Sequence, residues 1–297
     1  PQRGTYLPEA SNTISALFIG FCGAHMLIFW DHESAFMRVI SALFVVNGWG
    51  SALFHAYSTG DFGAVDADSM LFTVWLIMGF ILEELVEAVQ RRGGKLPRGA
   101  PARVRKVAMS VFWVLSLSVA WWMLAGAHFN DREYYHEIFE YMFAIPIVGS
   151  LLVIIFLIRA GWIQNEYFCG EVEAMARRRF FLGIAAGLFG TVCWVPTEKL
   201  CETSKFFRTF PGHFLWHISM SWGMMNCLIY ACMLRADNHQ AYPRFKKGRG
   251  FVSRLYFLFY PAFVMEHRDW SPTMSNLRPE EAWSTQGSAS TPEKGFC

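Results

Sequence analysis

Apolar residues are concentrated in seven long runs, and short polar stretches separate these runs. The runs cover roughly residues 12–31, 35–58, 66–90, 104–126, 137–158, 178–197 and 210–234. A helix of roughly 20 apolar residues crosses the hydrocarbon core of a bilayer, which is about 30 Å thick. The pattern therefore predicts an all-α fold: a seven-transmembrane helix bundle that forms one domain over residues 1–235, without internal repeats.

The remainder, residues 236–297, is mostly polar, and we expect it to be a tail outside the bundle. One aromatic stretch, "FVSRLYFLFYPAFV" at 251–264, interrupts it. Two interpretations stay open for this stretch: a membrane-surface segment, or a tail folded on the bundle. The polar, low-hydrophobicity end "RPEEAWSTQGSASTPEKG" predicts disorder.

Basic residues predict how the bundle is oriented. The connection at 91–106 carries seven basic residues and no acidic one. Further basic groups precede the sixth apolar run, at 177–179, and follow the seventh. With seven helices, all three groups fall on the same side, and loops rich in Lys and Arg stay in the cytosol. We therefore predict a non-cytosolic N-terminus and a cytosolic C-terminus.

Composition agrees with a membrane protein. The chain is 54% hydrophobic and 17% charged, whereas soluble domains carry about 25% charged residues. The formal net charge of +2 gives no basis for a nucleic-acid partner, so the bilayer is the partner that we expect. None of the seven cysteines forms a C-x-x-C pair, and we interpret them mainly as small packing residues. Oligomeric state is not readable from this pattern.

Several polar residues lie within the apolar runs, where ionisable groups are costly and therefore mark candidate functional positions. Ser51 and His55 are four residues apart, as are His213 and His217, so each pair shares one helix face. Asp66 opens the third run. By the predicted topology, all five positions lie near the non-cytosolic face.

Three neutral imidazoles and one water form a catalytic zinc set. Zinc lowers the pKa of the water, a nearby carboxylate can accept its proton, and a serine can stabilise a developing oxyanion. Each residue alone also has a structural interpretation: a core histidine, a helix-capping aspartate, or a packing serine. Their common depth favours the metal interpretation.

Four other polar groups receive structural interpretations. We interpret His25 as a packed core residue. The glutamates near the end of the third run, Glu83, Glu84 and Glu87, are expected to face the basic connection at the cytosolic end of the helix.

The pattern S-x-x-x-H, followed eleven residues later by D, with H-x-x-x-H in the last run, resembles the seven-helix membrane hydrolase superfamily. That superfamily includes alkaline ceramidases, adiponectin-receptor-like proteins and Per1-type proteins that remodel GPI anchors. The resemblance implies that His55, His213 and His217 bind zinc. It also implies that Ser51 and Asp66 act as the catalytic pair beside the metal.

Two further stretches indicate the branch. The segment "PEASNTIS" at 8–15 resembles the E-x-x-N-T-x-S segment of alkaline ceramidases. The segment "WVPTEKLC" at 194–201 resembles their W-x-x-D-x-x-x-C stretch, with Thr197 at the aspartate position and Glu198 beside it. The Cys-rich segment that precedes the first helix of Per1-type proteins is not present. Alkaline ceramidases are therefore the closest match, over roughly residues 5–235.

The alkaline ceramidase resemblance also implies a calcium site just before the first helix. Glu9 matches its last carboxylate and Asn12 lies one turn further, so both are candidates for a partial calcium site. The other ligands would precede Pro1.

These observations predict a zinc-dependent amidohydrolase of the endoplasmic reticulum or Golgi membrane. It would hydrolyse ceramide to a sphingoid base and a free fatty acid. Two alternatives stay open: a Per1-type GPI-lipid ester hydrolase, and an adiponectin-receptor-like membrane receptor. Preference for a particular acyl chain or sphingoid base depends on pocket shape.

Overall fold

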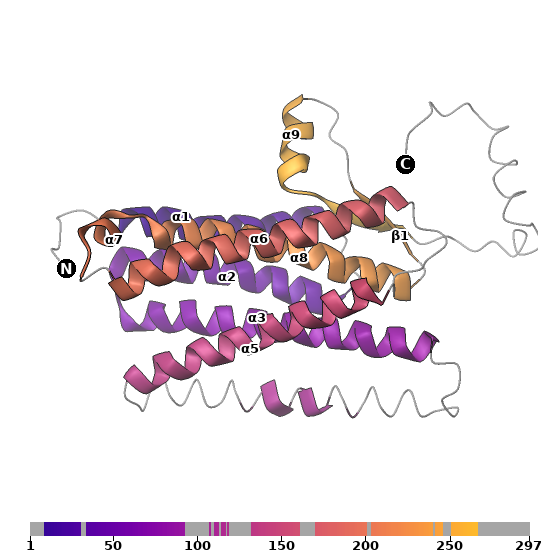
Figure 1. Cartoon of the computed structure of the whole chain (residues 1–297), viewed down its shortest axis with the longest axis horizontal. Helices are drawn as coiled ribbons and strands as arrows, with labels where there is room; N and C mark the ends of the chain where they lie inside the picture. Colours follow the sequence, from indigo (N-terminus) through magenta and orange to yellow (C-terminus); the bar gives the residue numbers. More distant parts are fainter. Residues whose placement is uncertain are drawn as a thin grey trace, which may run out of the picture.

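Long helices run side by side along one axis and make up most of the described chain (Figure 1). The computed structural model describes residues 9–30, 34–92, 107, 110–112, 114–116, 118, 132–160, 170–200, 203–239, 241–245 and 251–266. The long helices are α1 (Ala10–Phe29), α2 (Ala35–Tyr57), α3 (Gly60–Arg92), α5 (Arg132–Arg159), α6 (Gly170–Leu200) and α8 (Gly212–Asn238). The short helix α7 (Lys205–Thr209) connects α6 to α8.

Six of the seven predicted helices correspond to these long helices, with ends that differ by up to about eight residues. The fourth predicted helix, 104–126, lies largely outside the described residues. Those of its residues that are described, at 107, 110–112, 114–116 and 118, are all helical. The all-α class fits, while the count of seven spans stays a prediction.

Among the described residues, five helices are long and apolar enough to cross a membrane, which indicates a membrane protein. The apolar spans within them are Ala10–Phe29, Ala35–Tyr57, Asp61–Val89, Phe139–Arg159 and Val172–Leu200. The remaining long helix, α8, carries histidine, serine and asparagine side chains on its buried side, among them His217, Ser221 and Asn226. A helix surrounded by protein needs less apolar surface than one that faces lipid, so α8 suits the interior of the bundle.

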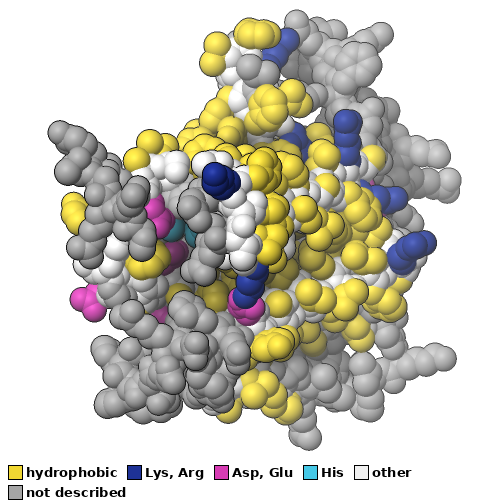
Figure 2. Space-filling model, turned by 60° about the vertical axis from the view of Figure 1, so that its left-hand side comes forward, with side chains coloured by type: hydrophobic (Ala, Val, Ile, Leu, Met, Phe, Trp, Pro, Cys, Tyr) yellow, Lys and Arg dark blue, Asp and Glu magenta, His cyan; other side chains and the backbone are white. Residues whose placement is uncertain are grey.

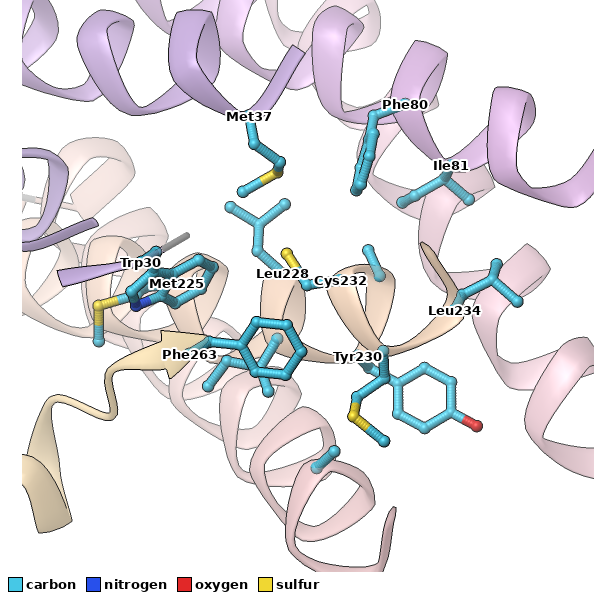
Figure 3. Close-up of a cluster of buried hydrophobic side chains, with 14 of the residues drawn as sticks. Trp30, Met37, Phe80, Ile81, Met225, Leu228, Tyr230, Cys232, Leu234 and Phe263 are labelled. Carbon is cyan, nitrogen blue, oxygen red and sulfur yellow. The ribbon is translucent and has the colours of Figure 1, made fainter. Parts of the chain in front are cut away.

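The hydrophobic core is built around the second half of α8. Figure 3 shows Met225, Leu228, Tyr230 and Leu234 of this helix surrounded by side chains from other elements. Those neighbours are Trp30 after α1, Met37 of α2, Phe80 and Ile81 of α3, and Phe263 near the C-terminal end of the described chain. Because α8 is central, its two ends are fixed relative to most of the bundle.

Glycines allow α1 and α2 to approach each other closely. A Cβ atom added at Gly48 would lie 2.2 Å from the Gly20 backbone nitrogen and 2.5 Å from the Gly20 Cα. One at Gly23 would lie 2.7 Å from the Ser41 carbonyl oxygen. Small residues at helix interfaces are typical of membrane bundles, where tight packing replaces the hydrophobic driving force between helices.

The chain after α8 folds back on the bundle. Strands β1 (Tyr242–Phe245) and β2 (Phe263–Glu266) form an antiparallel ribbon with Tyr242 opposite Glu266, and helix α9 (Phe251–Phe259) lies between them in sequence. The aromatic stretch at 251–264 is thus α9 and the start of β2. Residues 267–297, including the stretch predicted to be disordered, lie outside the described residues.

Replacing Gly48 by alanine should destabilise the protein, because the new methyl group would collide with the α1 backbone. We expect a loss of about 1–3 kcal/mol, the usual cost of overpacking. Gly149→Ala is the matched control, since its added Cβ would meet only Met78 Cε, at 4.0 Å. Thermal unfolding in one detergent should show a lower Tm for Gly48→Ala alone; equal Tm values would contradict this helix contact.

Candidate metal centre

Three histidines meet at one end of the bundle. His55 comes from the last turn of α2, while His213 and His217 come from the first two turns of α8. One ring nitrogen from each histidine lies within 4.8 Å of the other two. The ring centroids are 4.6–5.3 Å apart. His55 and His217 are buried, whereas 24% of the His213 side chain is exposed.

Local structure explains why these positions coincide. Helix α2 ends just after His55, where Ser58 adopts a left-handed conformation (φ 54°) and its N–H binds the Phe54 carbonyl oxygen. Helix α8 begins at Gly212, immediately after Pro211. A Cβ at Gly212 would lie 2.2 Å from the Cys193 carbonyl oxygen, so only glycine allows α8 to start this close to α6. Figure 2 shows histidine and acidic side chains in a recess at this end.

Each histidine uses its Nδ1 atom for a hydrogen bond to a different neighbour. His55 Nδ1 lies 2.5 Å from Glu9 Oε2, before α1. His213 Nδ1 lies 2.9 Å from Glu198 Oε1, near the end of α6. His217 Nδ1 lies 2.8 Å from the Ser15 hydroxyl of α1. The start of α1 thus orients the rings of His55 and His217, and the end of α6 orients that of His213.

These contacts define which ring nitrogen carries the proton. A carboxylate only accepts hydrogen bonds, so His55 and His213 donate from Nδ1. The hydrogen bond from His55 lowers the pKa of Glu9 to about 2, so this carboxylate is ionised near neutral pH. Ser15 donates its own proton to the Asn12 carbonyl oxygen, 3.1 Å away, and therefore accepts one from His217 Nδ1. In neutral rings, all three Nε2 atoms then keep a free lone pair.

This donor set fits a zinc ion. Neutral imidazoles bind zinc through a nitrogen lone pair at about 2.0–2.1 Å, and metal-binding histidines usually donate their other N–H to a carboxylate or another acceptor. The Nε2 atom of His55 is buried and has no hydrogen-bond partner among the described residues. An ion bound by the three rings would satisfy this atom.

The two predicted catalytic residues lie beside the histidines. Asn47 of α2 donates hydrogen bonds to the Asp66 carboxylate (3.0 Å) and to its carbonyl oxygen (3.0 Å), and so fixes the start of α3 against α2. The buried Ser51 hydroxyl lies near the Asp66 carboxylate, yet no described partner meets hydrogen-bond geometry for it. The charge of Asp66 interacts with His55 and His213. Asp66 is therefore held near the rings, next to the buried hydroxyl of Ser51.

The candidate calcium residues contact each other as well as the histidine cluster. The Asn12 amide donates to Glu9 Oε2 at 3.0 Å, the same oxygen that accepts from His55. Half of the Glu9 side chain, 48%, is exposed. A calcium ion stays a prediction, since its other expected ligands lie outside the described residues.

An apolar pocket lies within the bundle, next to the histidine cluster. His217 and Asn47 belong to its wall, so the pocket and the cluster share residues. Its apolar walls include Ile19, Phe44, Met70, Val74, Met220 and Met224. A polar cluster beside an apolar pocket suits a substrate with a polar bond and a hydrocarbon chain.

A second group of potential ligands, Glu84, Glu87 and His239, lies at the other end of the bundle. Glu84 is fully buried, contrary to the expectation that it faces the basic connection, because α8 supplies its partners. Its oxygens accept hydrogen bonds from Arg235 Nη1 at 2.6 Å and Asn238 Nδ2 at 2.8 Å. A guanidinium already neutralises this carboxylate, so the group is better explained as a structural ion pair.

Sequence reasoning did not identify the residues that orient the rings. Ser15 and Glu198 lie in the two quoted stretches "PEASNTIS" and "WVPTEKLC", but nothing in either stretch indicates a histidine partner. Glu198 stands next to Thr197, whose hydroxyl binds the Cys193 carbonyl oxygen of its own helix. Of these two neighbours, Glu198 is the one whose side chain contacts a histidine.

Comparison with known proteins gives one family. The family model described as "Ceramidase" matches residues 2–255. No curated protein matches the chain.

Ser15→Ala should weaken metal binding, because His217 would lose the acceptor that keeps the proton on Nδ1. Loss of such a partner typically lowers metal affinity about 10–100-fold. Ser41→Ala is the matched control: this serine is also buried in a helix, but among the described residues its hydroxyl binds just the Met37 carbonyl oxygen of its own helix, at 2.8 Å. Chelator competition followed by elemental analysis measures the affinity; equal loss in both variants would disprove the orienting role.

Proposed function

Because this chain belongs to the ceramidase family, we propose that it is a zinc-dependent amidohydrolase that converts ceramide to a sphingoid base and a free fatty acid. The observation that carries the proposal is the set of three Nδ1 hydrogen bonds to Glu9, Ser15 and Glu198. They leave three histidine nitrogens available for one ion, in a chain that the family match links to ceramide hydrolysis.

His55, His213 and His217 would hold the ion. When bound, zinc lowers the pKa of a water in its open coordination position toward about 7 and polarises the substrate carbonyl. Hydrolysis also needs a base for the water and an acid for the leaving amine. Asp66 is the candidate for both roles, because its carboxylate is partly buried near the rings and held by Asn47. It would accept the proton from water and later donate it to the nitrogen of the sphingoid base.

Ser51 would bind the oxygen that becomes negatively charged when water attacks the amide carbon. Its hydroxyl is buried, near Asp66, and without a described partner that meets hydrogen-bond geometry. A donor placed in advance for a developing oxyanion typically contributes about 10²–10³-fold in rate.

The apolar pocket would receive one hydrocarbon chain of the lipid. His217 and Asn47 belong to its wall, so a chain bound there would hold the amide bond close to the histidines. Neither alternative from the sequence is favoured: the match is to ceramidases, and none of these residues indicates an ester substrate or a receptor ligand. We also propose residence in the endoplasmic reticulum or Golgi membrane, on the resemblance to alkaline ceramidases alone.

His217→Ala should abolish both metal binding and ceramide hydrolysis. The wild-type protein should contain about one zinc and release sphingoid base from ceramide, because three histidines with one open position form a catalytic site. His239→Ala, which alters the second group at the opposite end, should retain both properties. Elemental analysis and mass spectrometry of the products, made on one preparation, measure the two properties together.

The outcomes separate the site from the substrate. Zinc without sphingoid base, but with fatty acid released from an acyl-glycerol, would keep the metal centre and reject the amide substrate. An active wild-type protein without zinc would reject the metal centre.

Asp66→Asn should retain zinc and lose most activity, because asparagine preserves the shape of the side chain but cannot accept the proton. General base catalysis contributes about 10²–10⁴-fold, so kcat should fall by a factor in that range. Asp61→Asn, an exposed aspartate in the first turn of the same helix, is the control and should leave kcat unchanged. Loss of zinc in Asp66→Asn would indicate a structural role instead.

A further inference from the structure

Helix α9 crosses the direction of the long helices instead of following it (Figure 1). We call residues 251–263 the strap; they include α9 and the turn into β2. Strand β1, which precedes the strap, pairs with β2 at its end, so that Phe245 lies opposite Phe263. The strap therefore leaves the bundle and returns to it as one closed loop.

Side-chain N–H groups from the bundle bind the carbonyl groups at the end of α9. The last carbonyls of any helix lack partners within the helix. Here Arg179 of α6 donates to the Leu258 carbonyl oxygen, and Trp222 of α8 donates to that of Phe259, at 3.0 Å. Trp30 donates to the Pro261 carbonyl oxygen at 2.8 Å. Contacts with α6, α8 and the end of α1 thus fix the strap on the bundle.

His25 adds the contact that fixes the rotation of α9. Its Nε2 lies 3.1 Å from the Pro261 carbonyl oxygen, which can only accept, so Nε2 carries the proton in the neutral ring. Its Nδ1 then accepts from the Tyr256 hydroxyl at 2.7 Å. Tyr260 packs beside it, with its ring 5.1 Å from Phe21. His25 is thus a hydrogen-bonded core residue, and Tyr256 and Tyr260 face α1.

Four apolar side chains of α9 are exposed, and we call the surface that they form its outer face. Phe251 is 80% exposed and Val252 is 77% exposed. Leu258 and Phe259 are 59% and 52% exposed. The hydrogen bonds of the strap hold these side chains away from the bundle. Only a partner outside the described chain could therefore shield them from water.

Two features indicate that this partner is lipid. The outward side chains of α1, including Ile28 at 69% exposure, belong to a helix long and apolar enough to span a membrane, and α9 packs against the same helix. The outer face of α9 therefore lies beside a helix surface that is apolar enough to face lipid. Residues 242–264 also carry five basic side chains and no acidic one, which suits anionic headgroups.

We propose that the outer face of the strap binds the bilayer. Helix α9 lies in the plane of the membrane leaflet, beside the bundle and close to the end of α1 that is farther from the histidine cluster (Figure 1). Phe251, Val252 and Leu258 enter the region where headgroups meet acyl chains, as amphipathic in-plane helices do. The aromatic stretch had two open interpretations, a membrane-surface segment and a tail folded on the bundle. Under this proposal both apply: the inner face of α9 packs on the bundle, and the outer face binds lipid.

The test places a small fluorescent amino acid at Val252 in the full chain, reconstituted in nanodiscs of phosphatidylcholine and phosphatidylserine. Quenching is measured with doxyl-labelled lipids and, separately, with aqueous iodide. Two matched positions calibrate the signals. Ile28 on α1 represents a lipid-facing side chain, and Lys205 on α7 represents an exposed position in a connecting helix. Because all three side chains are exposed, the label should not disturb folding.

We expect doxyl lipids to quench the label at 252 at least half as strongly as at 28, and iodide to quench it several-fold less than at 205. Strong iodide quenching with little doxyl quenching would overturn the proposal, because the face would then lie in water. Protection from both quenchers would also overturn it and would indicate that a protein surface, such as a second copy of the chain, covers α9. The native mass of the particle then identifies that copy.

Discussion

Three imidazole rings meet inside an apolar bundle, and each must place its outer N–H on a partner from another segment. A buried polar group left without a partner costs about 1–3 kcal/mol, so these hydrogen bonds hold the ends of the helices at one depth. Glu9 and Ser15 join the start of α1 to α2 and α8, while Glu198 joins the end of α6 to α8. The geometry of the proposed centre therefore depends on how the ends of four helices pack, and the same hydrogen bonds hold both in place.

The glycine contact between α1 and α2 allows the helix ends to come close enough for these hydrogen bonds. Ser15 must approach His217 from α1 while His55 approaches from α2, so the two helices must lie close together near the cluster. Gly20 and Gly48 remove the side chains that would separate them. As a consequence, the contact surface between α1 and α2 does not accommodate larger residues at these positions.

Polar groups elsewhere in the bundle also bind partners within the protein, because the hydrocarbon region has no water to satisfy them. At the end opposite the histidines, Arg235 and Asn238 satisfy the buried Glu84. His25 and Trp30 bind the strap. The end near the histidines carries the proposed chemistry. Helix α8 carries the ion pair at the opposite end, and α1 holds the strap beside the bundle.

Much of this arrangement could be predicted from hydropathy and spacing. Apolar runs located six of the long helices, and a spacing of four residues put Ser51 with His55, and His213 with His217, on shared faces. The membership of the ceramidase family was also predicted correctly, from a few short motifs. The roles of the site residues and the identity of the metal stay predictions.

The sequence by itself determined which segments are helical and which polar residues share a helix face, because both follow from local periodicity along the chain. Only the tertiary structure decided the partners: Glu198 with His213, Ser15 with His217, Glu84 with Arg235, and His25 with Tyr256. These pairs join residues that are 15 to 231 positions apart. Which side chains meet at such separations depends on how closely and at what rotation the helices pack, and no local pattern carries that information.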